Sequence, residues 1–85
     1  MKRIEYTITD PLGIHARPAG LLVKAAQGFE SKITIATDAK SADARRIMAL
    51  MGLCVKGGQA ITVTCEGPDE DAAAEGMESF LKANL

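Results

Sequence analysis

A strand pattern and a helix pattern follow one another in residues 2–27, KRIEYTITDPLGIHARPAGLLVKAAQ. Apolar and polar side chains alternate over residues 2–9, which predicts a half-buried strand. The segment 10–13, DPLG, ends that alternation, because aspartate, proline and glycine favour turns. From Ala16 to Gln27 apolar residues recur at helical spacing, so a helix is expected there. The only histidine of the chain therefore falls between a strand and a helix.

The helix predicted over residues 16–27 has a suitable start and a suitable end. Pro18 falls in its first turn, where a missing backbone N–H costs no helical hydrogen bond. Gly28 directly follows the helix and is expected to end it in the left-handed conformation. The residues expected to face the core are Ala19, Leu22, Val23 and Ala26.

The middle of the chain predicts two strands and a short helix. Residues 32–37 alternate between polar and apolar side chains, with Ile33 and Ile35 facing inward. A second, short strand is expected over residues 40–43. Residues 45–53 are apolar at a density that fits a short helix lying on a sheet.

The last third of the chain predicts a strand followed by a helix. Gly57-Gly58 is expected to form the turn that precedes the strand. The segment 67–69, GPD, precedes the last helix, whose acidic first turn and late lysine suit the helix dipole. Two sets of residues are expected to face the core: Ile61, Val63 and Cys65 from the strand, and Ala73, Met77, Phe80 and Leu81 from the helix.

The predicted order of elements is βαββαβα. Each strand has one apolar face, and there are enough amphipathic helices to cover one side of a sheet. These features predict an α+β fold with an antiparallel sheet and its helices on a single face. The length of 85 residues fits one domain over residues 1–85.

The composition argues against several classes of function. The net charge of −1 is unlike a general nucleic-acid-binding protein, which needs a basic surface. No apolar run approaches the ~20 residues that span a bilayer, and the acids of the alternating first segment are unlike a signal peptide. We therefore expect a cytoplasmic protein without membrane insertion and, since this fold needs no partner to form, a monomer.

The two cysteines, Cys54 and Cys65, are eleven residues apart. This spacing is neither the CxxC of metal sites nor a disulfide framework. We expect two small buried thiols in a reducing compartment, and a bridge between them remains an alternative. No metal site is expected, because one histidine without suitably spaced cysteines supplies too few ligands.

The histidine, His15, is expected at or next to the N-cap of the first helix. Free backbone N–H groups of the first turn, from about Ala16 to Ala19 without Pro18, carry a partial positive charge and suit a phosphate. Arg17 adds a planar fork of donors for phosphoryl oxygens. The neutral imidazole is the nucleophile of such a site. A solvated or capping histidine is the alternative that this chemistry alone leaves open.

The segment around this histidine, GIHARPA at residues 13–19, closely resembles the active-site motif of the HPr family. HPr proteins are the histidine phosphocarriers of the bacterial phosphoenolpyruvate-dependent sugar phosphotransferase system. The resemblance covers essentially the whole chain, in length and in the order of elements. Two more regions match, residues 40–58, KSADARRIMALMGLCVKGG, and residues 67–70, GPDE.

The resemblance implies an open-faced β-sandwich, in which a four-stranded antiparallel sheet carries three helices on one face. It implies that Enzyme I phosphorylates His15 on Nδ1 and that the group passes to the IIA component of a sugar permease. Arg17 would assist transfer, and Ala16 would act as a backbone donor. The protein would be a carrier, not an enzyme, and would need no cofactor, because it holds the phosphoryl group covalently. A regulatory paralogue that carries phosphate on His15 without serving sugar transport is the alternative.

The predicted second helix is a candidate docking surface. Its apolar residues run almost without a break, and a short helix on a sheet buries only one stripe. With Leu50 and Leu53 facing inward, two methionines remain outside, and exposed methionines suit several partners. The alternative is that all of its apolar residues belong to the core. The resemblance favours docking to Enzyme I and IIA, and the candidates are Gly20, Lys24, Gln27, Arg45, Ile47, Met48, Met51 and Gly52.

Three positions depart from the family pattern. Many HPr proteins carry a regulatory serine just before Ile47, where this chain has Arg46, so regulation by the serine kinase is not expected. Cys54 stands where glycine is usual, and it is strained if the position needs a positive φ. Leu12 replaces a small polar residue that is common beside the histidine, which removes a possible hydrogen bond to the site.

Overall fold

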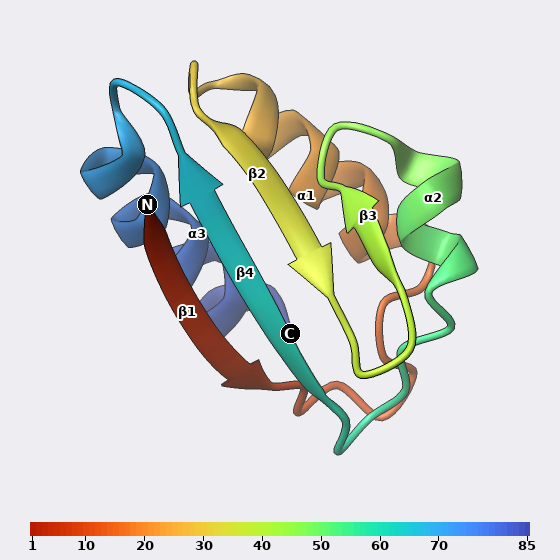
Figure 1. The fold of residues 1–85 in the computed structure, drawn as a ribbon. Helices are drawn as coiled ribbons and strands as arrows, with labels where there is room; N and C mark the ends of the chain where they lie inside the picture. Colours follow the sequence, from red (N-terminus) through yellow and green to blue (C-terminus); the bar gives the residue numbers. More distant parts are fainter.

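Four strands form one antiparallel sheet, and the helices gather behind it (Figure 1). The computed structural model describes residues 1–85. The strands lie in the order β1-β4-β2-β3, so β1 and β3 are the edges of the sheet. None of the helices combines the length and the apolar character that a membrane span requires. The predicted α+β architecture and βαββαβα order are confirmed. The elements are β1 (Lys2–Thr7), α1 (Ala16–Gln27), β2 (Lys32–Ala36), β3 (Ser41–Asp43), α2 (Ile47–Gly52), β4 (Ala60–Glu66) and α3 (Glu70–Asn84).

The strand register separates an apolar face of the sheet from a polar face. Ile4, Val63 and Ile35 lie side by side across β1, β4 and β2, and Ala42 continues the row on β3. Because successive side chains of a strand point to opposite faces, the adjacent row points away from the helices. That row is polar and consists of Arg3, Thr64, Thr34 and Asp43.

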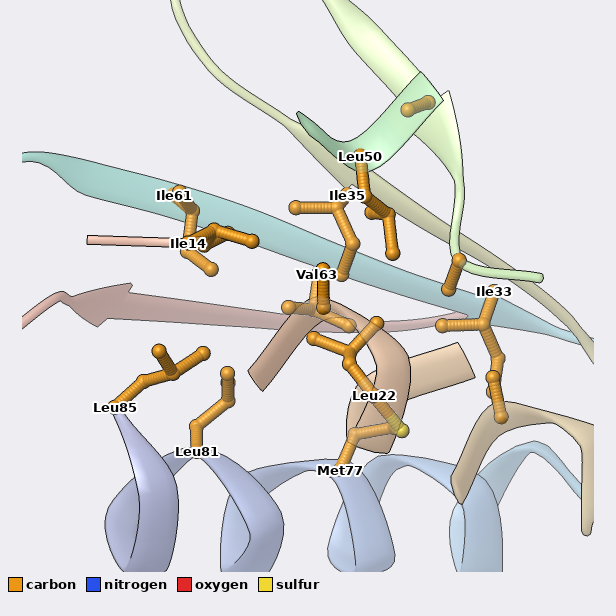
Figure 2. Packing of buried hydrophobic residues seen from close by; sticks show 14 of the residues in the cluster. Ile14, Leu22, Ile33, Ile35, Leu50, Ile61, Val63, Met77, Leu81 and Leu85 are labelled. Atoms are coloured by element: carbon orange, nitrogen blue, oxygen red, sulfur yellow. The ribbon is translucent and has the colours of Figure 1, made fainter. Parts of the chain in front are cut away.

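The core lies between the apolar face of the sheet and the helices (Figure 2). Leu22 enters it from α1, and Leu50 and Leu53 close it from the α2 region. The predicted inward stripes are confirmed, with Val23 and Phe80 half-buried against the core. The fully buried residues of α3 are Ala73, Met77 and Leu81.

Helix α2 is shorter than expected at its start. It begins at Ile47 and not at Arg45. Asp43 Oδ1 accepts a hydrogen bond from the Arg45 N–H at 2.9 Å, and Asp43 O accepts one from the Arg46 N–H at 3.0 Å. These local bonds compete with helical ones, so the chain turns before the helix can begin. The neighbouring strands are also one residue shorter than expected, β2 at its end and β3 at its start. The first strand, expected to reach Thr9, ends at Thr7, because the Thr9 N–H donates to Leu85 O and not to β4.

The expected left-handed end of α1 is wrong. Gly28 has a φ of −75°, in the right-handed region. Its N–H donates to Ala25 O at 3.2 Å, and the Phe29 N–H donates to Ala26 O at 3.2 Å. The last turn therefore tightens, which satisfies the terminal carbonyls without a positive φ.

Both cysteines are free, and their settings differ. Cys65 is buried in β4, and burial raises the pKa of its thiol, with Asp69 and Glu70 adding to the effect. Cys54 is exposed after α2. The expectation of two buried thiols is therefore wrong for Cys54, because the chain leaves the core between Leu53 and Val55.

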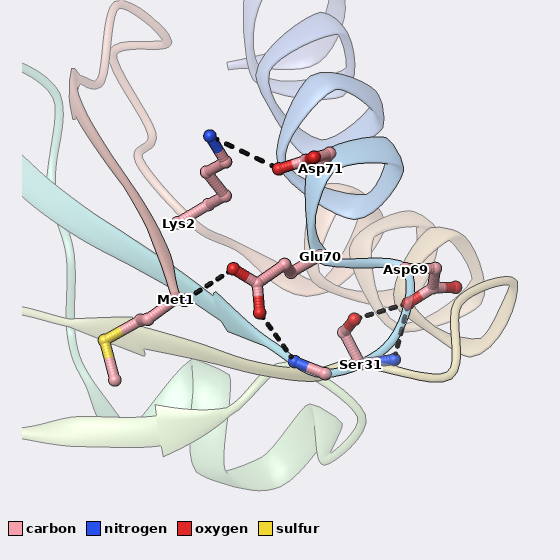
Figure 3. Close-up of polar contacts among 7 residues, drawn as sticks. Met1, Lys2, Ser31, Asp69, Glu70 and Asp71 are labelled. Atoms are coloured by element: carbon pink, nitrogen blue, oxygen red, sulfur yellow. Dashed lines mark hydrogen bonds and ion pairs between the residues drawn. The ribbon is translucent and has the colours of Figure 1, made fainter.

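Carboxylates tie the start of α3 to the neighbouring segments (Figure 3). Asp69 accepts hydrogen bonds from the N–H groups of Glu30 at 2.9 Å and Ser31 at 2.8 Å, and from the Ser31 hydroxyl. The hydroxyl bond is the main reason why the pKa of Asp69 lies below its ordinary value. Glu70 Oε2 lies 2.5 Å from the amino nitrogen of Met1, which lowers the pKa of Glu70. This end of the molecule is thus stabilised by charges of its own helix.

Candidate functional site

Backbone contacts fix the loop between β1 and α1. The Ile14 N–H donates to Val55 O at 3.1 Å, and the Gly58 N–H donates to Ile8 O at 2.8 Å. Gly13 has a φ of +68°, and a Cβ at this position would lie 1.9 Å from Val55 O. Only glycine fits such a position. The loop that leads into α1 is therefore held in one conformation.

His15 is the N-cap residue of α1. Its backbone is extended, with φ −100° and ψ −177°, and its side chain makes no capping hydrogen bond. His15 O accepts the helical hydrogen bond of Ala19 at 2.9 Å, so the expectation of a free Ala19 N–H is wrong. The free donors are the N–H groups of Ala16 and Arg17, since Pro18 has none. No acidic residue lies in this first turn, so no acid of the helix itself matches the partial positive charge of the helix end.

A depression of about 260 Å³ surrounds the histidine side chain. The side chain of His15 is 36% exposed, so it can be reached from solvent. Asp10 Oδ2 lies 3.6 Å from His15 Nε2. The structure thus brings the predicted pair of His15 and Arg17 to one hollow. Its lining residues are Asp10, His15, Arg17, Pro18, Leu21 and Asn84.

Four of these lining residues, Asp10, Pro18, Leu21 and Asn84, were not predicted as site residues, and Leu21 and Asn84 lie farthest from His15 in the sequence. Leu21 is 44% exposed and lies one helical turn after Arg17. Its i+4 spacing, together with its absence from the inward stripe of α1, could have indicated this position. Asn84 comes from the opposite end of the chain, so its place depends on how α3 packs and not on any local pattern.

Helix α2 buries one stripe and exposes the other. Leu50 is buried, whereas Ile47, Met48 and Met51 are 39%, 78% and 39% exposed. The alternative in which all of its apolar residues belong to the core is therefore wrong. A Cβ on Gly20 would lie 3.7 Å from Ile47 Cδ1, so α2 contacts α1 closely there. The exposed apolar residues of α2 and the helix that His15 begins thus form one surface, the α1–α2 surface.

The remaining docking candidates fall into two groups. Three are exposed on α1 and α2: Lys24, Gln27 and Gly52. Arg45 is half-buried, and its Nη2 donates to Phe29 O and, at 3.0 Å, to Ser31 O. Arg45 therefore joins the loop before α2 to the end of α1 and the start of β2. The guanidinium of Arg45 is therefore bonded inside the fold, unlike the exposed docking candidates.

Comparison with known proteins gives the family. A family profile described as "PTS HPr component phosphorylation site" matches residues 2–83. The chain is 46% identical over 81 residues to the phosphocarrier protein HPr of Lysinibacillus sphaericus, covering 95% of this chain and 92% of that protein. The chain belongs to the HPr family. Like its relatives it is a phosphocarrier of the phosphotransferase system, a carrier of phosphoryl groups rather than a catalyst.

Further HPr proteins agree in sequence and in structure. The HPr of Mycoplasma capricolum is 38% identical over 81 residues, which cover 95% of this chain and 91% of that protein. The crystal structure of HPr-C-His from Thermoanaerobacter tengcongensis superposes with a TM-score of 0.92 at 35% identity. That match covers 98% of this chain and 93% of the other. The fold implied by the resemblance is therefore confirmed.

The three departures from the HPr pattern have different settings. Arg46 is the exposed N-cap of α2 and makes no side-chain capping bond. Cys54 has a φ of +55°, so it adopts the left-handed conformation that costs a non-glycine residue about 1 to 2 kcal/mol. Leu12 is 70% exposed, and only its backbone takes part in the site: its N–H donates to Asp10 Oδ1 at 2.8 Å.

Proposed function

We propose that His15 accepts the phosphoryl group on Nδ1, and that Arg17 and the backbone N–H of Ala16 hold its oxygens. The observation that carries this proposal is the start of α1, where a partly exposed histidine occupies the N-cap position of a helix that has no acid in its first turn. A helix start of this kind favours an anion. The guanidinium of Arg17, exposed in the same hollow, offers donors in the geometry that phosphoryl oxygens prefer.

The proposed partners are Enzyme I as donor and the IIA components of sugar permeases as acceptors. Residues 11–29 and 44–65 contain no aspartate or glutamate, although the whole chain has a net charge of −1. The α1–α2 surface therefore combines exposed apolar side chains with positive charge alone. Partners with an acidic rim around an apolar centre would fit it and would meet it quickly. Its proposed members are Gly20, Lys24, Gln27, Ile47, Met48, Met51 and Gly52.

Three further parts of the proposal concern regulation, oligomeric state and cellular location. The exposed side chain of Arg46 has no hydroxyl, so the usual serine kinase has nothing to modify at this position. We further propose that the protein acts as a monomer in the cytoplasm, where Enzyme I and IIA are reached by diffusion. A regulatory paralogue would also carry phosphate on His15, but would fail to pass it to a sugar-specific IIA.

The test of the site is phosphorylation by Enzyme I and phosphoenolpyruvate, followed by intact mass measurement. We expect an acid-labile gain of one phosphoryl group in the wild-type protein and no gain in His15→Ala. Circular dichroism of both proteins checks that the fold is unchanged. A gain that persists in His15→Ala would place the phosphoryl group elsewhere, and no gain in the wild type would contradict the proposed function.

The α1–α2 surface is tested by a matched pair of charge substitutions. Met48→Glu places an acid at the centre of this surface, and Ala60→Glu places one at an exposed position of β4. We expect the KM of Enzyme I for Met48→Glu to rise about tenfold, because truncating or charging a central contact removes much of a small interface. Equal KM values for the two variants would remove α2 from the docking surface.

A further inference from the structure

We propose that Asp10 is a positioning residue for His15, whose carboxylate keeps the ring proton on Nε2 and leaves the Nδ1 lone pair for the phosphorus. The inference rests on the proposed role of His15. It starts from one contact: Asp10 Oδ2 lies 3.6 Å from His15 Nε2. The tautomer of a histidine is set by the partner of one nitrogen, and a carboxylate beside Nε2 favours a proton there.

The carboxylate of Asp10 is itself held in place. Its second oxygen, Oδ1, accepts the Leu12 N–H at 2.8 Å. The Asp10 N–H donates to Leu85 O at 2.9 Å, and the Thr9 hydroxyl donates to the same oxygen at 2.7 Å. Leu85 is only 3% exposed, so this anchor belongs to the core. One carboxylate oxygen is therefore fixed by the loop, and the other remains free toward the ring.

The other side of the loop is equally constrained. A Cβ on Gly57 would lie 2.7 Å from Asp10 O, so the turn before β4 packs directly against this residue. The side chain of Asp10 is 27% exposed, less than that of His15. Asp10 is the only carboxylate within 4.0 Å of His15, and Leu12 offers no polar side-chain atom. No other acid competes for the ring.

The contact matters on both sides of the transfer step. The Nδ1 lone pair forms the N–P bond while the donor's bond to phosphorus breaks, and that bond's electron pair leaves with the donor. The Nε2 proton stays on the ring, so the ring becomes cationic once Nδ1 is phosphorylated. Asp10 then lies beside a positive charge, which stabilises the phosphorylated form. When the group passes on to an acceptor, the ring returns to its neutral form with the proton still on Nε2.

The expected size of the effect follows from exposure. The two side chains are partly exposed and 3.6 Å apart, so the contact resembles a solvent-screened ion pair more than a buried one. We expect Asp10→Asn to slow phosphoryl acceptance about two- to fivefold. Asparagine keeps an oxygen for the Leu12 N–H, so the loop should remain folded. Asp10→Glu, which restores the charge, should recover part of the rate.

The deciding experiment is nitrogen NMR of the His15 ring in alkaline solution, recorded where its ring nitrogen shifts no longer change with pH. We expect the Nε2–H tautomer to dominate in the wild type, and the share of Nδ1–H to rise about two- to fivefold in Asp10→Asn. Asp38→Asn, the same charge change in the exposed β2–β3 turn, is the control and should match the wild type.

The NMR readout needs no phosphate, so it separates this inference from the proposed function. An Asp10→Asn protein with the wild-type tautomer ratio and the transfer rate of Asp38→Asn would overturn the role of Asp10 and leave His15 as the carrier. A wild type that takes no phosphate would instead contradict the proposed function, whatever its tautomer.

Discussion

The starts of α1 and α3 differ in whether acidic side chains match the partial positive charge of the helix N-terminus. At α3, Asp69 is the N-cap, and Glu70 and Asp71 fill the first turn (Figure 3). These carboxylates match the positive helix end and bind neighbouring segments. At α1, the N-cap is His15, and the first turn has no acid. The positive end of α3 is therefore matched by carboxylates at its own start, whereas the first turn of α1 contains no carboxylate.

This difference separates stability from function. Acids in a first turn stabilise a helix by about 0.3 to 1 kcal/mol each, so α1 forgoes a stabilising contribution that α3 has. The same absence leaves α1 free to accept an anion from outside. The proline in its first turn removes one donor but costs no helical bond, and the buried Pro18 also fixes the backbone behind His15. The proposed site thus lies at the helix end that has no acid of its own in the first turn.

Removing the side-chain charge at the start of α1 should have the largest effect. Arg17→Ala should slow phosphoryl transfer about tenfold, because a charge-assisted hydrogen bond to the phosphoryl oxygens is lost. Stopped-flow or quenched transfer from phosphorylated Enzyme I measures the rate. Lys32→Ala, an exposed lysine on β2, is the control for the change in net charge. Equal rates for these two variants would remove Arg17 from the mechanism.

Placing an acid in the first turn of α1, as in α3, should have the next largest effect on the rate of phosphoryl transfer. Ala16→Asp should slow transfer about fivefold through repulsion between its carboxylate and the incoming phosphoryl group. It should also raise Tm by about 1 to 8 °C, because the acid matches the helix dipole. Ala16→Asn, which keeps the shape without the charge, is the control. A loss of stability together with unchanged transfer would show that the start of α1 is not a functional anion site.

Weakening the carboxylates at α3 should lower stability without altering transfer. Asp69→Asn leaves the N–H groups of Glu30 and Ser31 with a poorer acceptor, so Tm should fall by several degrees. Asp71→Asn is the matched control in the same turn, because its carboxylate contacts only Lys2 on an exposed surface. Thermal unfolding at neutral pH measures the Tm of both variants. A change in transfer rate in Asp69→Asn would mean that the two helix ends are coupled.

The dependence of stability on pH in the acidic range tests the same carboxylates. The pKa values of Asp69 and Glu70 are lowered from their ordinary values of 3.8 and 4.5. Between the lowered and the ordinary value, the unfolded chain binds more protons than the folded one, so stability rises with pH. Their contribution is complete above the ordinary values and is lost as pH falls through the lowered ones. Asp69→Asn should flatten this dependence on pH, and an unchanged dependence would contradict the assignment.

The local parts of this account could be predicted from the sequence. The bounds of α1 and the inward residues of β2 and β4 follow from periodicity. The place of His15 at a helix start follows from the break before it and the helix after it. Each of these depends on residues that are close in the chain, where pattern and structure are directly related.

The parts that could not be predicted depend on distant segments. Arg45 looked like an exposed charge, but it donates to the carbonyls of Phe29 and Ser31, which tertiary packing brings to it. The position of Asp10 beside His15 depends on its backbone hydrogen bond to Leu85, which follows the C-terminal end of α3. The start of α2 depends on a side-chain bond of Asp43 that competes with helix formation. Periodicity carries no information on these contacts.

The central claim is that the phosphoryl group sits on Nδ1 of His15 at the start of α1. Nitrogen and phosphorus NMR of the protein phosphorylated by Enzyme I and phosphoenolpyruvate tests it most directly. The account predicts coupling between phosphorus and the Nδ1 atom of His15, with the largest backbone amide shifts at Ala16 and Arg17. Phosphorus on Nε2, phosphorus on another residue, or amide shifts centred on the start of α3 would contradict it.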